Sequence, residues 1–211
     1  MPPTFSLFAI SQAPGEDWFR ALAAAGIADI AGIGAVQIRE KHLEDRALWE
    51  LTRRARAALP SPVRLLVNGR LDVALAAGAD GVHLPSDGLP VAALRARFGP
   101  GVLIGRSTHR VEEVDRARDE GADYVTFGPV YETPGKGAPV GLAGLERAAA
   151  SAGGLPVYAL GGVTLSRFGE LAGAGAAGVA GIRLFQKTSD LNDLGDLRLV
   201  ARAAREHFCR P

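Results

Sequence analysis

The sequence is poor in cysteine, with only Cys209 among its 211 residues. A single cysteine cannot form a disulfide within the chain, and such sparing use is typical of proteins in the reducing cytoplasm. Cys209 lies close to the end of the chain, where segments are often mobile, so we do not expect it to act as a nucleophile. These features predict a cytoplasmic protein whose fold does not depend on disulfides.

The sequence also lacks an excess of either charge. Its 24 Lys and Arg residues balance 23 Asp and Glu residues, which leaves a formal net charge of +1. Because nucleic-acid-binding surfaces carry a marked basic excess, we expect no nucleic-acid partner. No stretch approaches the roughly 18 apolar residues of a membrane span. Residues 1–12 lack the basic start and long apolar stretch of a signal peptide, so we expect no membrane partner.

The sequence does contain short apolar runs that alternate with longer amphipathic stretches. Residues 43–59 place their leucines near one helical face, and residues 111–121 show the same spacing and end at a glycine. Hydrophobic residues make up 47% of the chain, enough for a sizeable core. The eight apolar runs cover residues 6–10, 35–40, 63–68, 81–84, 102–107, 123–128, 156–161 and 178–182.

This alternation predicts an α/β fold. Continuously apolar runs are typical of strands in a sheet that is covered on both faces. A strand followed by a helix, repeated eight times, is the pattern of the (β/α)8 TIM barrel, which needs roughly 200 to 250 residues. Because no long linker or change in composition divides the chain, we predict one TIM-barrel domain over residues 1–211. A doubly wound open sheet is the alternative.

A short internal repeat supports the barrel. Residues 76–82, 119–125 and 173–179 share the pattern Gly-Ala-x-x-Val. In each copy the glycine is predicted to end a helix, with the next strand beginning about three residues later. The alternative is that a chain rich in alanine and glycine produces such matches by chance.

Polar residues that end the apolar runs are the first candidates for a site. In a TIM barrel the active site lies at the C-terminal ends of the strands. Gln37, Arg39 and Lys41 are two residues apart and share one face of an extended strand. Arg39 and Lys41 are suited to bind an anion, and the alternative is a solvated charge cluster. Asn68 and Ser107 end two further runs, and we expect both to bind substrate.

Two glycine-rich segments suggest a phosphate site and a covering loop. Gly161 and Gly162 separate an apolar run from the next helix, where backbone N–H groups can hold a phosphate. Arg183, just past the last run, could add full charge to the same group. The alternative is a tight turn. Residues 128–141 form a long loop that contains Thr133 and Lys136. We expect the loop to close over the site and these two residues to bind substrate. The alternative is a surface loop without a role in binding.

Among the four histidines, His109 is the candidate for catalysis. It follows the run 102–107 among polar residues, and an imidazole can give or take a proton near neutral pH. His83 lies within an apolar run, which favours a hydrogen-bonded core position over catalysis. His42 and His207 look like surface residues. No histidines or carboxylates show the spacing of metal ligands, so we predict no metal site.

Several motifs, taken together and in this order, resemble the thiamine phosphate synthase and TenI family. The resemblance covers nearly the whole chain and implies a TIM barrel of thiamine biosynthesis that binds a thiazole phosphate. The motifs are VQIREK (36–41), LVNGRLDVAL (66–75), GADGVHL (78–84), IGRSTH (104–109), GADYVTFGPVYETPGKG (121–137) and ALGGVT (159–164).

The family resembled has two enzyme branches. Thiamine phosphate synthase, a transferase, joins a pyrimidine diphosphate to a thiazole phosphate and uses magnesium to handle the diphosphate. That branch carries one aspartate directly after the residue matching Asn68 and a second after the strand matching 81–84. Here these positions are Gly69 and Gly88, with Asp87 as a lone neighbour. Because magnesium is usually held by one or two carboxylates plus substrate phosphate, their loss argues against this branch.

The TenI branch resembles a thiazole tautomerase, which isomerises a carboxylated dihydrothiazole phosphate to the aromatic thiazole phosphate. Its Gly-Arg-Ser-x-His stretch matches residues 105–109, which implies His109 as the proton shuttle, with Lys41 the next candidate. The substrate carboxylate would face Arg39 and Lys41, and its phosphate would lie at the two glycines and Arg183. On this resemblance we predict an isomerase of the tautomerase type that needs no cofactor.

Two alternatives remain open. Gln37 matches a glutamine of the synthase, so the first is the magnesium-dependent transferase. The second is a non-catalytic regulatory barrel that binds thiamine intermediates. In any of these a homodimer would be unsurprising.

Overall fold

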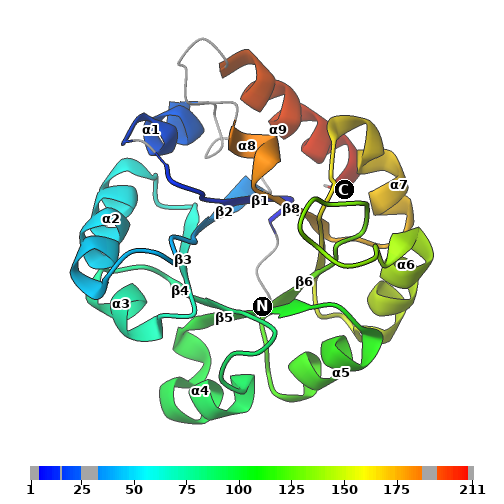
Figure 1. Ribbon diagram of the computed structural model, residues 1–211, viewed down its shortest axis with the longest axis horizontal. Coiled ribbons are helices and arrows are strands. Elements are labelled where there is room, and N and C mark those ends of the chain that lie inside the picture. The colour runs from blue at the N-terminus through cyan, green and yellow to red at the C-terminus, as the bar shows by residue number, and fades with distance from the viewer. Residues whose placement is uncertain (1–4, 15, 25–32, 187–193, 209–211) are drawn as a thin grey trace.

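Eight parallel strands close into a barrel, and the helices surround it (Figure 1). The computed structural model describes residues 5–14, 16–24, 33–186 and 194–208, so Cys209 lies outside the described residues. Every run predicted as a strand is one, and the TIM-barrel prediction is confirmed. The strands are β1 (Leu7–Ile10), β2 (Ile33–Ile38), β3 (Arg64–Asn68), β4 (Gly81–Leu84), β5 (Leu103–Thr108), β6 (Tyr124–Phe127), β7 (Val157–Leu160) and β8 (Gly178–Gly181).

The helices follow the amphipathic stretches of the sequence. The stretch 43–59 contains α2, whose side chains Leu48, Leu51 and Ala55 are buried. No helix in the described part of the chain is long and apolar enough to cross a membrane. The helices are α1 (Glu16–Ala24), α2 (Asp45–Ala58), α3 (Leu71–Ala76), α4 (Val91–Phe98), α5 (Val111–Asp119), α6 (Gly141–Ser151), α7 (Phe168–Gly173), α8 (Arg183–Gln186) and α9 (Leu194–Phe208), with 3-10 turns η1 (Gly99–Gly101) and η2 (Leu165–Arg167).

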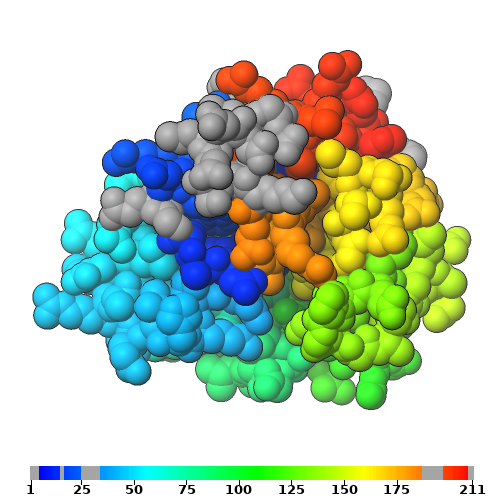
Figure 2. All heavy atoms as spheres, turned by 45° about the horizontal axis from the view of Figure 1, so that its top comes forward, coloured from blue at the N-terminus to red at the C-terminus, as the bar shows by residue number. Residues whose placement is uncertain are grey.

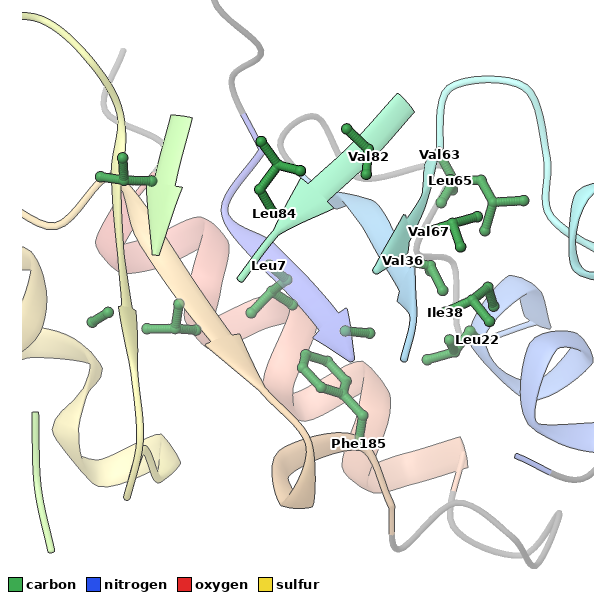
Figure 3. Packing of buried hydrophobic residues seen from close by; sticks show 14 of the residues in the cluster. Leu7, Leu22, Val36, Ile38, Val63, Leu65, Val67, Val82, Leu84 and Phe185 are labelled. Carbon is green, nitrogen blue, oxygen red and sulfur yellow. The ribbon is translucent and has the colours of Figure 1, made fainter. Parts of the chain in front are cut away.

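The core has two layers because successive side chains of a strand point to opposite faces. The outer layer lies between the strands and the helices, where Figure 3 shows Leu22 of α1 and Phe185 of α8 among the strand residues Leu7, Val36 and Ile38. The inner layer fills the barrel and is rich in aromatic rings. It consists of Phe5, Phe8, Ile10, Ala35, Leu66, Tyr124, Tyr158 and Ala180.

Two strand glycines lie too close to their neighbours to carry a side chain. The ring of Tyr124 lies so close to Gly105 that a Cβ atom at residue 105 would be 2.1 Å from the tyrosine Cζ. On the neighbouring strand, a Cβ at Gly81 would lie 1.9 Å from the carbonyl oxygen of Leu103. Both positions therefore require glycine for space, and the sequence pattern alone does not reveal this requirement.

The repeated glycines behave as the sequence predicts. Gly78, Gly121 and Gly175 have φ angles of 74°, 85° and 85°, in the left-handed region that favours glycine. Each stands three residues before the start of a strand, β4, β6 or β8. The role predicted for the repeat is confirmed.

Two copies of the repeat also carry an aspartate that ties a strand to a helix. Asp80 Oδ2 accepts the backbone N–H of Leu65 at 2.8 Å and Nη1 of Arg56, on α2, at 3.1 Å. In the same way, Asp123 Oδ2 accepts the N–H of Ile104 at 2.7 Å and Nη2 of Arg95, on α4, at 2.6 Å. These contacts lie at the starts of the strands, the end of a TIM barrel that serves stability.

We predict that Gly105→Ala destabilises the barrel, because its new methyl group would overlap the buried ring of Tyr124. Overpacking of this kind typically lowers the free energy of unfolding by about 1 to 3 kcal/mol. The matched control is Gly101→Ala, where a Cβ has no heavy atom within 4 Å. Urea unfolding of both variants measures the difference, and equal stability would contradict the close packing around Tyr124.

Candidate active site

The interior of the barrel changes from aromatic to polar toward the C-terminal ends of its strands. Since strand side chains alternate, a residue two positions after an inward-facing one also points inward. We call the resulting set the polar layer. It lies closer to the C-terminal ends of the strands than the aromatic rings do, and it comprises Gln37, Asn68, His83, Ser107 and Thr126.

Gln37 presents an unpaired hydrogen-bond acceptor. Its side chain is 1% exposed, and Nε2 donates to Oδ1 of Asn68 at 2.9 Å. Its other polar atom, Oε1, is buried and has no hydrogen-bond partner among the described residues. Leaving a buried polar atom unsatisfied costs about 1 to 3 kcal/mol. A ligand that offers an N–H or O–H group at this point would remove that cost.

His83 is a buried, hydrogen-bonded residue, as the sequence predicts. Its Nδ1 lies 2.9 Å from the hydroxyl of Tyr124, and its Nε2 lies 2.9 Å from Oγ of Ser107. Burial lowers the pKa of the imidazole to about 3, and the nearby positive charges of Arg106 and Arg39 act in the same direction. The imidazole is therefore neutral at physiological pH, so one ring nitrogen donates and the other accepts.

Arg39 and Lys41 stand at the rim, beside the polar layer. Arg39 is half-buried and its backbone N–H donates to Oγ of Ser11 at 2.9 Å, whereas Lys41 is exposed. Between them, Glu40 is 5% exposed and accepts the Ser11 hydroxyl at 2.5 Å and the Ala13 N–H at 2.8 Å. The carboxylate of Glu40 thus holds the loops after β1 and β2 together.

A cavity of about 270 Å³ opens beside this rim. Gly69 contributes no side chain to it, has a φ of 68° and donates its N–H to the carbonyl of His83 at 2.9 Å. Arg70 also lines the cavity, but its guanidinium is paired with Asp45 and Asp72. The lining residues are Ile38, Glu40, Lys41, Leu43, Leu48, Asn68, Gly69 and Arg70.

The loop after β4 likewise offers no ligand set for a metal. Arg106 holds this loop by donating to the carbonyls of Ser86 at 2.8 Å and Leu89 at 2.6 Å. Gly88 carries no donor atom on a side chain, and Asp87 is exposed. In the described ranges no three His, Cys, Asp or Glu residues are grouped as metal ligands would be.

His109 lies on the rim and not in the polar layer. It is exposed, directly after β5, and its backbone N–H donates to Oε2 of Glu113 at 2.6 Å. Its Nδ1 forms a short hydrogen bond with the carbonyl of Gly128, at the start of the loop after β6. The histidine thus bridges two neighbouring loops.

The Gly161–Gly162 turn is packed against the loop after β6. Gly161 and Gly162 have φ angles of 95° and 64°. A Cβ on Gly161 would lie 2.6 Å from Cβ of Pro129, and one on Gly162 would lie 2.6 Å from Cβ of Tyr131. Glycine is therefore required here for packing, whether or not the turn also binds a phosphate.

The structure brings some of the predicted binding residues together and leaves others apart. Thr133 lies against the turn, since its Oγ1 would be 3.1 Å from a Cβ on Gly161. Lys136, in the same loop, is exposed. Arg183 is exposed at the start of α8. The binding roles of these residues stay predictions.

Sequence reasoning misses several residues of this region. Tyr124 lies in an apolar run and looks like an ordinary core residue, yet its hydroxyl meets His83. Arg167 and Glu170 lie after the turn and match no motif, although both contact Tyr131. These contacts join separate segments, so local sequence carries no signal for them.

The neutral state of His83 predicts a pH dependence of stability. The usual pKa of histidine is 6.5 and that of folded His83 is about 3, so between these values only the unfolded chain binds the proton. The free energy of unfolding should fall as the pH drops below 6.5, by about 1.4 kcal/mol per pH unit. Urea unfolding between about pH 6 and pH 4 measures how the free energy of unfolding changes with pH. In His83→Gln this slope should be smaller by the contribution of one proton. Equal slopes in both proteins would contradict the assignment.

Comparison with known proteins identifies the family. The sequence profile of the TMP-TENI family, described as thiamine monophosphate synthase, matches residues 10–185. A Geobacter sulfurreducens protein, provisionally named a thiamine-phosphate synthase, is 46% identical over 180 residues, or 82% of this chain and 83% of that protein. The thiamine-phosphate synthase of Methanoculleus marisnigri is 41% identical over 199 residues, or 89% and 85%. Among solved structures, the thiamine phosphate pyrophosphorylase of Pyrococcus furiosus superposes with a TM-score of 0.82 at 28% identity, covering 96% of each chain.

These relatives correct the predicted activity. The sequence predicts a tautomerase, an isomerase, from the loss of two aspartates at Gly69 and Gly88 and from the Gly-Arg-Ser-x-His match at residues 105–109. The prediction is wrong, because relatives that are 41% to 46% identical over most of the chain carry the name of a synthase, which is a transferase. The proton transfer assigned to His109 and Lys41 loses its basis with it. The chain belongs to the thiamine monophosphate synthase family.

Proposed function

We propose that this chain is a transferase of the thiamine-phosphate synthase type, which joins a pyrimidine diphosphate to a thiazole phosphate. The names of its relatives support the reaction class. The single structural observation that carries the proposal is the unpaired acceptor of Gln37 in the polar layer. A pyrimidine that bears an amino group or a ring N–H could donate to this oxygen, and the neighbouring Asn68 holds the glutamine in place.

The remaining groups suit the two anionic ends of the substrates. In the coupling, the bond between the pyrimidine's exocyclic carbon and its diphosphate breaks, and a bond from that carbon to the thiazole nitrogen forms. The electron pair of the broken bond leaves with the diphosphate, whose negative charge grows. Arg39 and Lys41 at the rim would stabilise this charge. The thiazole phosphate would bind at the Gly161–Gly162 turn, where Thr133 adds a hydroxyl.

The described residues do not fit a carboxylate-held magnesium ion of the kind this family implies. Magnesium prefers oxygen ligands, commonly one or two carboxylates together with substrate phosphate. Gly69 and Gly88 supply none, and both oxygens of the nearby Glu40 already accept hydrogen bonds. Lys41 and Arg70 line the same cavity, so its fixed charges are partly cationic. Charge stabilisation in the proposed reaction therefore rests on the chain's own cations.

We predict that Gln37→Leu weakens binding of the pyrimidine substrate. A lost hydrogen bond of about 1.4 kcal/mol corresponds to a tenfold rise in KM for the pyrimidine diphosphate. The KM for thiazole phosphate should change little and serves as the internal control. Steady-state measurement of product formation tests both constants. Absence of coupling by the folded wild-type protein would refute the proposed function.

We also predict that the free protein has no saturable magnesium site at the mouth of the barrel. Without a pair of carboxylates, calorimetric titration with magnesium chloride should show only weak, non-saturating heats. Repeating the titration with Lys41→Ala tests whether a cation at the rim suppresses binding. A saturable site in the wild-type protein, lost on Asp87→Asn, would show that Asp87 substitutes for the missing aspartates.

A further inference from the structure

Three side chains from separate segments meet beside the Gly161–Gly162 turn. Tyr131 comes from the loop between β6 and α6, Arg167 ends the η2 turn, and Glu170 lies in the first turn of α7. The guanidinium carbon of Arg167 is 3.9 Å from the centre of the Tyr131 ring, and the tyrosine hydroxyl donates to Oε1 of Glu170 at 2.5 Å. We call these three residues the Tyr131 clamp.

The clamp connects the covering loop to the turn. Arg167 stacks on the ring and also donates through Nη1 to the carbonyl of Gly162 at 2.5 Å. The N–H of Tyr131 donates to the carbonyl of Gly161 at 3.1 Å. In Figure 1 the loop after β6 lies beside α7, and in Figure 2 its green atoms lie against the orange and yellow atoms of the later segments. One arginine thus touches both the loop and the backbone of the turn.

The rest of the covering loop is built on Tyr131. Thr133 Oγ1 donates to the carbonyl of Tyr131 at 2.9 Å. The N–H of Lys136 then donates to the carbonyl of Thr133 at 3.1 Å. A shift of Tyr131 would therefore move both polar residues that the sequence assigns to substrate binding.

The chemistry of the clamp suits a fixed but reversible attachment. Glu170 is exposed, and Tyr131 and Arg167 are only half-buried, so the clamp lies at the surface. Burial and the hydrogen bond to Glu170 raise the pKa of the Tyr131 hydroxyl, so the group stays protonated and keeps donating. A planar guanidinium can stack on a ring and donate to a carbonyl at once, which the ammonium of lysine does not reproduce.

We propose that Arg167 is a positioning residue that holds the loop after β6 against the Gly161–Gly162 turn and thereby sets the affinity for a phosphate monoester. The identity of that ester as thiazole phosphate rests on the proposed function. The positioning role of Arg167 does not depend on the proposed function.

The central test is Arg167→Met, which keeps an unbranched side chain and removes the guanidinium. Amide hydrogen exchange across residues 130–137 should become faster. The dissociation constants for inorganic phosphate and thiazole phosphate should rise about five- to tenfold, the range expected for a lost cation–π contact and hydrogen bond. In the coupling assay KM for thiazole phosphate should rise while kcat changes little. Arg167→Lys should give an intermediate result.

Arg53→Met is the matched control, because Arg53 also stacks on an aromatic ring, that of Trp49, at 5.1 Å on the remote helix α2. It should leave the loop exchange and both affinities unchanged. Tyr131→Phe, which keeps the ring and loses only the bond to Glu170, should accelerate loop exchange moderately and carries the test if Arg167→Met does not fold.

The outcomes separate this proposal from the proposed function. Faster loop exchange and weaker inorganic phosphate binding in Arg167→Met support the positioning role even if the wild-type protein shows no coupling. Unchanged loop exchange with unchanged phosphate affinity would overturn it. A uniform loss of thermal stability, without local change in exchange or affinity, would overturn it as well and assign the clamp to general stability.

Discussion

The ring of Tyr124 lies against Gly105 inside the barrel, and this contact fixes the position of the tyrosine hydroxyl. Through that hydroxyl it also helps to position His83 and Ser107 at the C-terminal ends of the strands. The barrel can close only if its interior is filled. Rings from β1, β6 and β7 fill it, and Gly105 on β5 leaves room for the ring of Tyr124. Phe8 meets Tyr124 edge to face with ring centres 5.5 Å apart. The hydroxyl of Tyr124 is hydrogen-bonded to His83, and His83 is in turn hydrogen-bonded to Ser107. The arrangement of the polar layer therefore depends on the packing of the rings beneath it.

Electrostatics divide the mouth into a neutral floor and a cationic rim. Burial keeps His83 neutral, and the positive charges of Arg39 and Arg106 add to this effect. Three acidic groups nearby are occupied: Glu40 holds two loops together, and Asp45 and Asp72 pair with Arg70. A neutral, hydrogen-bonding floor suits a ring such as a pyrimidine, whereas the rim suits its diphosphate. Both belong to the transferase that we propose.

The misassigned activity has a specific cause. Gly69 and Gly88 are two positions in a chain that resembles synthases along most of its length. In the sequence the two missing aspartates stand out and Gln37 does not, because the burial of its unpaired oxygen exists only in the folded structure. Likewise, the paired glycines at 161 and 162 suggest phosphate binding, yet their packing against Pro129 and Tyr131 is reason enough for both to be glycine.

Sequence by itself determined the eight strands, the helices between them and the family. Apolar runs and the glycines at 78, 121 and 175 report local backbone preferences, which depend on neighbours in the chain. It also separated the buried His83 from the exposed His109. Only the tertiary structure decided that Gln37 keeps a free acceptor, that Gly105 makes room for Tyr124, and that Arg167 reaches Tyr131. The contact of Gly105 with Tyr124 joins residues 19 positions apart, and that of Arg167 with Tyr131 joins residues 36 positions apart. Their geometry, like the burial of the Gln37 oxygen, exists only once the barrel has closed.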